Sequence, residues 1–373
     1  MTVPAAPAGK PRIESVDALR GMLACGIMLF HTTGWTGILQ DGLFQHFWNW
    51  LGIYGVEMFF VISGFSMAYV YSGKPLLTAI GLKDFYWKRF MRLWPLYVAA
   101  FAVATAFRML THDMEGVNWR NALLHTSLLF GFIDPSIKGI IGGWSIGVEV
   151  VCYAAFPLLM GAMGRPWPRM AAVSVLASGS VAWTAWQLDS RALLAPQWAE
   201  YVSPVNHLFL FAVGMYLAVH FQCHQPARPA WVSRAGLAVL LAIAVCSPLA
   251  ATDTATVTGV GRLVFVLLAA WMAWISIAQV ETPKPFDRVF NPIGLWSYSI
   301  YLLHPFAFQA LKLVGLGNFP AVHAVLTIAG TLGLSALSYK FLERPSVEWA
   351  RRKSAEWFAP GVQTVAISDS SSR

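Results

Sequence analysis

Charged residues are scarce in this chain of 373 residues. Asp, Glu, Lys and Arg together make up 12% of it, about half of the ~25% that soluble domains carry. A water-soluble, multi-domain globular protein needs more charge than this to cover its surface. Because 57% of the residues are hydrophobic, the composition predicts a polytopic membrane protein instead.

Cysteine is also rare, and the few cysteines are scattered. They form no C-x-x-C pair and no spacing typical of metal ligands, so we expect neither a disulfide framework nor a zinc site and predict no metal. We interpret them as small apolar residues within helices. The four are Cys25, Cys152, Cys223 and Cys246. Aromatic residues are abundant by contrast, and 17 Trp with 24 Phe favour the belts found at membrane interfaces.

Long apolar segments dominate the sequence. A bilayer-crossing helix needs about 20 mostly apolar residues, and ten segments qualify: 18–36, 52–71, 91–108, 144–163, 170–187, 206–221, 235–250, 261–280, 293–315 and 321–342. An eleventh apolar stretch, 121–133, is too short to cross and is predicted to be interfacial or re-entrant. The predicted fold is therefore all-α, a polytopic membrane helical bundle of about ten transmembrane helices.

Lysine and arginine are distributed unevenly over the predicted loops. With the N-terminus in the cytoplasm, 20 of the 26 lie on the cytoplasmic side, as the positive-inside rule requires. The outer six are Arg108, Arg120, Lys138, Arg191, Arg262 and Lys312. Both termini are therefore predicted to be cytoplasmic, and topology explains the net charge of +8 without a nucleic-acid partner. The predicted segments are an N-terminal tail (1–12), a membrane domain (13–350) and a polar, disordered tail (351–373).

Ionisable residues inside predicted spans are candidates for function, because they are costly to place in a membrane. His31 follows Arg20 by eleven residues, about 16 Å along a helix, which puts Arg20 near the cytoplasmic surface and His31 in the outer half. Glu149 is predicted to lie at a depth similar to that of His31. A Glu and a His at one depth suit general acid/base catalysis. Glu57 is predicted at the outer end of its span, where solvation explains it.

Structural alternatives remain open for these residues. Arg20 is compatible with a snorkelling anchor, His31 with a hydrogen-bonded core histidine, and Glu149 with a structural partner for a polar residue on a neighbouring helix. His304 precedes Pro305, so a histidine that bonds carbonyls freed at a helix kink explains it equally well.

Two arginines stand three residues apart near the predicted cytoplasmic surface. Arg89 and Arg92 share a helix face, with aromatic residues around them. Such a pair suits a phosphate-bearing ligand. Anchoring to lipid headgroups is the alternative interpretation.

Several of these residues belong to a series of longer elements. The series is VDALRGMLACGIMLFH, with Arg20 and His31; YGVEMFFVISGF; RFMRLWP, with Arg89, Arg92 and Pro95; WSIGVEVVCYAAFPLL, with Trp144, Ser145 and Glu149; SYSIYLLHPF, with Ser297, Tyr298, Tyr301 and His304; and FLERP, with Glu343, Arg344 and Pro345. In kind and order it resembles the acyltransferase-3 family of integral-membrane acyltransferases, whose members typically O-acetylate glycans.

The sequence departs from the family pattern at two positions and in one larger feature. Glu57 stands where Asp is frequent, and Val150 stands where a second acidic residue often follows the Glu. A mechanism with two adjacent carboxylates is therefore not expected. Many relatives carry a C-terminal extracytoplasmic esterase-like domain that this sequence lacks, so we expect direct delivery of the acyl group to the acceptor.

The resemblance implies acetyl-coenzyme A as the donor, with its phosphates held by Arg89, Arg92 and Arg20. His31, oriented by Glu149, would act as general base on the acceptor hydroxyl, with a covalent acetyl-His intermediate as the alternative. The residues expected to line the acceptor pocket or stabilise the oxyanion are Trp144, Ser145, Tyr298 and His304. The implied acceptor is a cell-surface or exported glycan or its lipid-linked precursor. The implied location is a bacterial-type inner membrane, in contact with membrane lipids and polysaccharide assembly machinery.

Three other functions compete with this hypothesis. Buried His31 and Glu149 would also suit a proton-coupled transporter, and many spans would suit a scaffold subunit of a polysaccharide export complex. The same enzyme machinery would also suit a different acyl group, such as succinyl.

Overall fold

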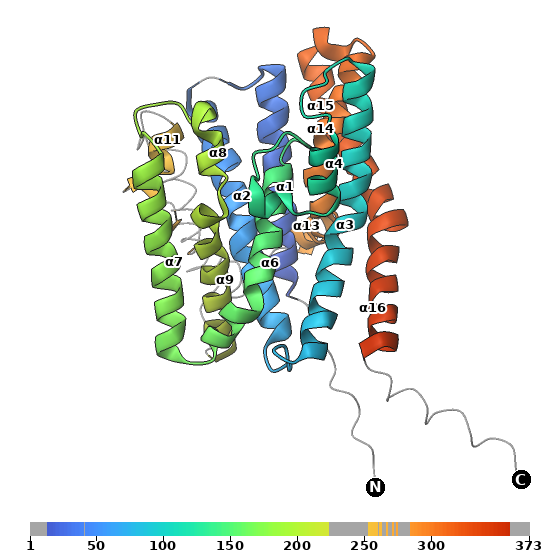
Figure 1. The fold of residues 1–373 in the computed structure, drawn as a ribbon. Coiled ribbons are helices and arrows are strands. Elements are labelled where there is room, and N and C mark those ends of the chain that lie inside the picture. The colour runs from blue at the N-terminus through green and yellow to red at the C-terminus, as the bar shows by residue number, and fades with distance from the viewer. Residues whose placement is uncertain are drawn as a thin grey trace, which may run out of the picture.

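A computed structural model describes residues 13–40, 42–223, 253–259 and 284–358, together with positions 261, 262, 266, 267, 271 and 274. All regular secondary structure in these residues is helical, and the long helices form one bundle (Figure 1). The predicted span 235–250 lies outside the described residues, and most of 261–280 does too. Within the described part, five helices are long and apolar enough to cross a membrane: 50–71, 79–110, 143–163, 204–221 and 320–358.

The first six predicted spans each correspond to a long helix. These helices are α1 (Glu14–Thr36), α2 (Gly42–Tyr71), α3 (Ala79–Leu110), α6 (Gly143–Met163), α7 (Pro166–Gln187) and α9 (Pro204–Cys223). The stretch 121–133 folds as two short helices, α4 (Trp119–Thr126) and α5 (Phe130–Ile133), with Leu128 at a positive φ between them. Helices of this length cannot cross a bilayer, which agrees with the prediction for this stretch.

Two predictions at the C-terminal side need correction. The segment 293–315 is not one helix, because α13 (Lys284–Leu295) ends before Trp296 and α14 (Ser297–Leu313) begins after it. Trp296 has φ −90° and ψ 1°, outside the helical region. The last span does not end at residue 342, because α15 (Pro320–Ser338) continues through a π-helical turn (Tyr339–Glu343) into α16 (Arg344–Phe358). Residues 351–358, predicted as disordered tail, are therefore helical.

The connections define two ends of the bundle, named here as Figure 1 draws them. At the lower end α2 leads into α3, α6 leads into α7, and α16 ends. The upper end holds the longer connections, including 111–118 and 188–203. The second of these carries the short helices η1 (Ala195–Gln197) and α8 (Trp198–Tyr201).

Glycine permits close helix packing between α2 and α9. A Cβ added at Gly214 would lie 1.9 Å from the carbonyl oxygen of Val61, and one added at Gly64 would lie 2.0 Å from that of Phe211. Only glycine fits such an approach, because real Cβ atoms do not come closer than about 3 Å to backbone atoms. Small residues at helix contacts are typical of membrane bundles.

Candidate active site

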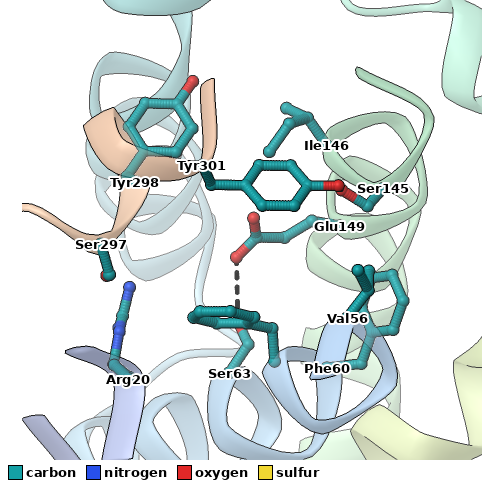
Figure 2. Close-up of a pocket in the computed structure, with 11 residues that line it drawn as sticks. Arg20, Val56, Phe60, Ser63, Ser145, Ile146, Glu149, Ser297, Tyr298 and Tyr301 are labelled. Atoms are coloured by element: carbon teal, nitrogen blue, oxygen red, sulfur yellow. Dashed lines mark hydrogen bonds between the residues drawn. The ribbon is translucent and has the colours of Figure 1, made fainter. Parts of the chain in front are cut away.

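A small cavity lies between α1, α2, α6 and α14 and contains several of the predicted residues (Figure 2). Its volume is about 60 Å³. Its polar lining comprises Arg20, Ser63, Ser145, Glu149, Ser297, Tyr298 and Tyr301. In Figure 2 the guanidinium of Arg20 points toward Ser297, and the carboxylate of Glu149 points toward Ser63. We call this the central cavity.

Glu149 is held by hydroxyl groups of two helices. Its Oε1 accepts hydrogen bonds from Ser63 Oγ at 3.0 Å and from the hydroxyl of Tyr153. The prediction that Glu149 orients His31 is therefore wrong for this structure. The two side chains come from different helices, and similar depth along the bundle did not place them face to face.

His31 instead pairs with His304, which was predicted as an acceptor-pocket residue. His31 Nδ1 lies 3.1 Å from His304 Nε2, and His304 Nδ1 lies 3.1 Å from the carbonyl oxygen of Ile300. His304 is fully buried, and Trp35 stacks on both imidazole rings.

This arrangement determines which nitrogen of each histidine carries a proton. A carbonyl oxygen only accepts, so His304 Nδ1 donates to Ile300. In a neutral imidazole His304 Nε2 then accepts, His31 Nδ1 donates to it, and His31 Nε2 keeps its lone pair. His31 Nε2 is thereby available to remove a proton from a bound group.

The three predicted donor-binding arginines converge at the lower side of the central cavity. Arg20, Arg89 and Arg92 line a cavity of about 100 Å³, which we call the arginine cavity. The guanidinium of Arg89 lies over the rings of Tyr71 and Tyr153, 5.7 and 5.9 Å from their centroids. The Nε atoms of Arg20 and Arg89 are buried and have no hydrogen-bond partner among the described residues. A buried guanidinium Nε–H without a partner suits an anionic ligand.

Glu343 supports this cluster, although the sequence suggested no role for it. It is buried in the π-helical turn, accepts a hydrogen bond from Ser299, and lies 3.8 Å from Arg92. Tyr298 also ties α14 to α3, because its hydroxyl donates to the carbonyl of Leu93 at 2.8 Å. The sequence signal that could have pointed to Glu343 is its place in the FLERP element. The structure adds a second sign, because π-helical turns are frequent at functional sites.

Neighbouring cavities share lining residues from one end of the bundle to the other. A lower cavity of about 500 Å³ shares Arg20 and Arg92 with the arginine cavity. The arginine cavity shares Ser63 and Glu149 with the central cavity. The central cavity meets an upper cavity of about 290 Å³ at Tyr301, and His31 lines this upper cavity.

Hydroxyl groups lie at the junction between the central and upper cavities. Tyr301 donates to the carbonyl of Gly142 at 2.9 Å and accepts from Ser145 at 2.8 Å. Trp144, the residue before Ser145 in the sequence, lines the upper cavity. The predicted acceptor-side residues Trp144, Ser145, Tyr298 and His304 thus all lie at or beside the cavities, but Tyr298 lies on the arginine side.

Comparison with known proteins gives this geometry its context. A family model described as an acyltransferase domain matches residues 13–340. The chain belongs to the acyltransferase-3 family.

Relatives of this acyltransferase come from several bacteria. ExoZ of Rhizobium meliloti, an exopolysaccharide production protein, is 28% identical over 87% of this chain and 96% of its own length. BcsY of Komagataeibacter xylinus, named a membrane-bound transacylase, is 26% identical over 92% of this chain and 85% of its own. The peptidoglycan O-acetyltransferase OatA of Listeria monocytogenes is 24% identical over 89% of this chain and 55% of its own. No solved structure matches the chain.

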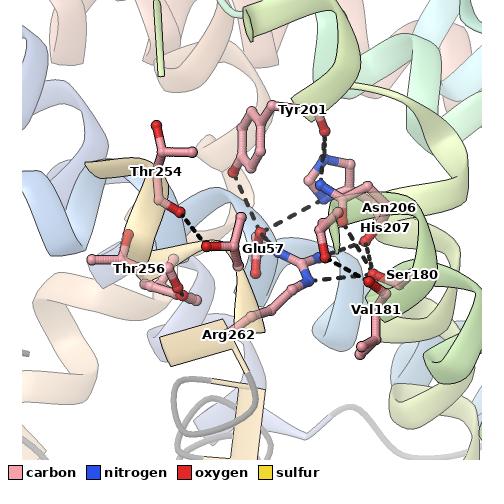
Figure 3. Close-up of polar contacts among 12 residues, drawn as sticks. Glu57, Ser180, Val181, Tyr201, Asn206, His207, Thr254, Thr256 and Arg262 are labelled. Atoms are coloured by element: carbon pink, nitrogen blue, oxygen red, sulfur yellow. Dashed lines mark hydrogen bonds and ion pairs between the residues drawn. The ribbon is translucent and has the colours of Figure 1, made fainter. Parts of the chain in front are cut away.

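One more buried charge cluster in this acyltransferase corrects an interpretation made from sequence (Figure 3). Glu57 is not solvated but fully buried, and its Oε1 lies 3.1 Å from Arg262 Nη1 and accepts from the Tyr201 hydroxyl at 3.3 Å. Arg262, counted from sequence as an outer loop charge, is 1% exposed and also donates to Ser180 and the carbonyl of Asn206. A buried ion pair of this kind fixes α2 relative to α7 and α9.

Proposed function

We propose that this protein transfers an acetyl group from acetyl-coenzyme A, bound at the lower end, to a hydroxyl of a glycan acceptor at the upper end. The observation that carries this proposal is the series of adjacent cavities, each sharing lining residues with the next, from the arginine cluster to His31. The acetyl assignment is supported by the family resemblance and by the name of OatA, a peptidoglycan O-acetyltransferase. The glycan assignment is supported by the names of ExoZ and OatA.

The lower end fits a phosphate-bearing donor. Four arginines, Arg20, Arg92, Arg344 and Arg351, line the lower cavity together with Asp17 and Glu348, and Glu348 pairs with Arg344 at 2.7 Å. The unpaired Nε atoms of Arg20 and Arg89 lie deeper. Guanidinium groups bind phosphate oxygens through charge-assisted hydrogen bonds. The excess of Lys and Arg predicted on the cytoplasmic side agrees with this end facing the cytoplasm, where acetyl-coenzyme A is made.

The histidine pair fits the acid/base chemistry of acyl transfer. His31 Nε2 takes the proton of the acceptor hydroxyl while that oxygen attacks the thioester carbonyl. A C–O ester bond forms, the C–S bond breaks, and His31 returns the proton to the departing thiolate. His304 holds His31 in the required tautomer. We assign Ser145 and Tyr301, at the junction of the central and upper cavities, to stabilising the charge that develops on the carbonyl oxygen.

Glu149 takes a different role from the one expected from sequence. It lines both the arginine and central cavities and is among the charges that act on Arg20. We assign it to positioning Ser63, Tyr153 and Arg20 along the donor path rather than to orienting the base.

A succinyl donor remains the second candidate, because Arg20 beside the central cavity would pair with the carboxylate of a succinyl group.

The test is acyl transfer by purified protein in proteoliposomes. Radiolabelled acetyl- or succinyl-coenzyme A serves as donor, and soluble neutral oligosaccharides or peptidoglycan fragments serve as acceptors. His31→Ala is expected to lower the transfer rate by about 10²- to 10⁴-fold, the usual contribution of a general base, with donor binding retained. His112→Ala, an exposed histidine at the upper end, is the control and should transfer normally. Full activity of His31→Ala would end the proposal.

A further inference from the structure

Six aromatic side chains, His31 included, line the upper cavity beside aliphatic residues and glycines. Phe30 and His31 come from α1, Trp144 from α6, Trp198 and Tyr201 from α8, and Tyr301 from α14. The volume of about 290 Å³ is at the lower limit of typical small-molecule sites. It therefore suits one small ring rather than a long chain.

The aromatic wall is held in place before any ligand binds. The ring of Trp144 lies edge-on to Trp198, with centroids 5.7 Å apart, and 5.8 Å from Tyr201. Tyr201 is fixed from behind, because its hydroxyl donates to Glu57 and its carbonyl accepts from Asn206 Nδ2 at 2.9 Å. The buried Glu57–Arg262 pair thus supports this wall, and a preorganised wall loses little entropy on binding.

Charge distinguishes this cavity from the donor side. The described residues that line it include no Asp, Glu, Lys or Arg, whereas the lower cavity is lined by four arginines. Glu57 and Arg262 lie behind the wall and are buried. A phosphate or carboxylate that entered the upper cavity would lose water and find no cation there.

We propose that the upper cavity binds one uncharged sugar ring of the acceptor, stacked on Trp198, with a ring hydroxyl at His31 Nε2. The C–H groups on the face of a pyranose carry a small positive charge, which matches the negative face of an indole. Trp198 is 38% exposed, so a ring entering from the upper end can reach it. The phosphate of a lipid-linked acceptor then stays outside the cavity. This inference rests on the proposed function.

The experiment compares sugars of equal ring shape and different charge. Methyl β-glucoside, methyl β-glucuronide and glucose 6-phosphate are tested as ligands of purified protein by saturation-transfer NMR and as acceptors of labelled acetyl groups. The variants are Trp198→Ala, Trp198→Phe as the conservative change, and Trp186→Ala as the control. Trp186 is 80% exposed on α7 and does not line the cavity. Slow hydrolysis of acetyl-coenzyme A, with water as acceptor, is measured alongside.

The inference predicts that only the neutral glucoside gives a saturation-transfer signal and is acetylated. Trp198→Ala should raise the KM for the glucoside at least fivefold relative to the Trp186→Ala control. Trp198→Phe and Trp186→Ala should behave nearly as the native protein does. Equal or better binding of the glucuronide or the phosphate, or a Trp198→Ala variant equal to Trp186→Ala, would overturn it. Native protein that hydrolyses acetyl-coenzyme A but binds no sugar would overturn this inference and leave the donor half of the proposed function standing.

Discussion

At the scale of single residues, the hydrogen-bonded chain from the Ile300 carbonyl through His304 to His31 has a direct consequence. His304→Leu removes the side-chain acceptor for His31 Nδ1–H and leaves the Ile27 carbonyl as the remaining hydrogen-bond partner of His31. It should lower transfer about 10- to 100-fold, as the loss of a partner that orients a metal-bound histidine does. His304→Gln retains a carbonyl oxygen that can accept this proton and should recover part of the rate.

The measurement for this prediction is the pH–rate profile of both variants beside the native protein. A role limited to packing would lower the rate equally at every pH and would not distinguish Gln from Leu. An orienting role changes the shape of the profile in His304→Leu and restores it in His304→Gln. Identical profiles in all three proteins would contradict the tautomer argument.

The burial of His125 in α4 leads to a prediction about stability in acid. Burial lowers the pKa of His125 to about 4, with the nearby Arg108 acting in the same direction. In the unfolded chain the pKa of His125 has its ordinary value of 6.5. The stability that the neutral, buried His125 retains is therefore complete above pH 6.5 and is lost as pH falls toward 4. Between pH 7 and pH 5 the loss is about 2 kcal/mol.

His125→Gln removes this titration and should reduce the drop in thermal unfolding temperature between pH 7 and pH 5. The measurement is thermal unfolding in detergent at both pH values. The hydroxyl of Tyr97, which contacts His125 Nδ1 at 2.8 Å, retains a polar partner in the variant. An equal drop in native protein and variant would show that His125 does not cause the acid sensitivity.

Residue identity and spacing were enough to select residues that line the cavities, but not to pair them. Arg20, Arg89 and Arg92, which the family resemblance assigned to one ligand, do line one cavity. The partner of His31 is 273 positions away in the sequence, and helix rotation decides which of two residues at similar depth it meets. The sequence gives no measure of that rotation for a helix that is apolar on every side.

At the scale of helices, the contact between α2 and α9 predicts a sharp response to added volume. Gly214→Val would force α9 away from Val61 and should lower stability by about 1–3 kcal/mol, the usual effect of overpacking. Gly179→Val on α7 is the matched control, because an added Cβ there meets no described atom within 4 Å. Thermal unfolding in detergent compares the two, and equal midpoints would contradict the close packing.

Helix existence was predictable for the first six spans because each is a long apolar run bounded by polar residues. Helix ends were harder to predict from hydropathy. The interruption at Trp296 falls between two apolar segments, so hydropathy alone predicts one continuous helix there. The ring of Trp87 in α3 contacts Trp349 and Trp357 of α16. Its Nε1 donates to the carbonyl of Ala350, also in α16, at 3.0 Å. Packing against α3 keeps this polar segment helical, although its composition is typical of a disordered tail.

At the scale of the whole molecule, the two ends of the bundle differ in chemistry. The lower cavities carry arginines, and the upper cavity is aromatic. Loop charge predicted a basic inner end, but it did not predict that neighbouring cavities share lining residues. The sharing depends on side chains from α1, α2, α6 and α14 meeting in space, which no single segment encodes.

The most direct test of the account is calorimetric binding of acetyl-coenzyme A to the purified protein in detergent. The native protein is compared with Arg89→Ala/Arg92→Ala and with Arg120→Ala/Arg191→Ala, which removes two exposed charges at the upper end. A cooperative thermal transition confirms folding of each. The account predicts saturable binding that is lost only in the Arg89/Arg92 variant. No binding to folded native protein, or equal binding in all three, would contradict it.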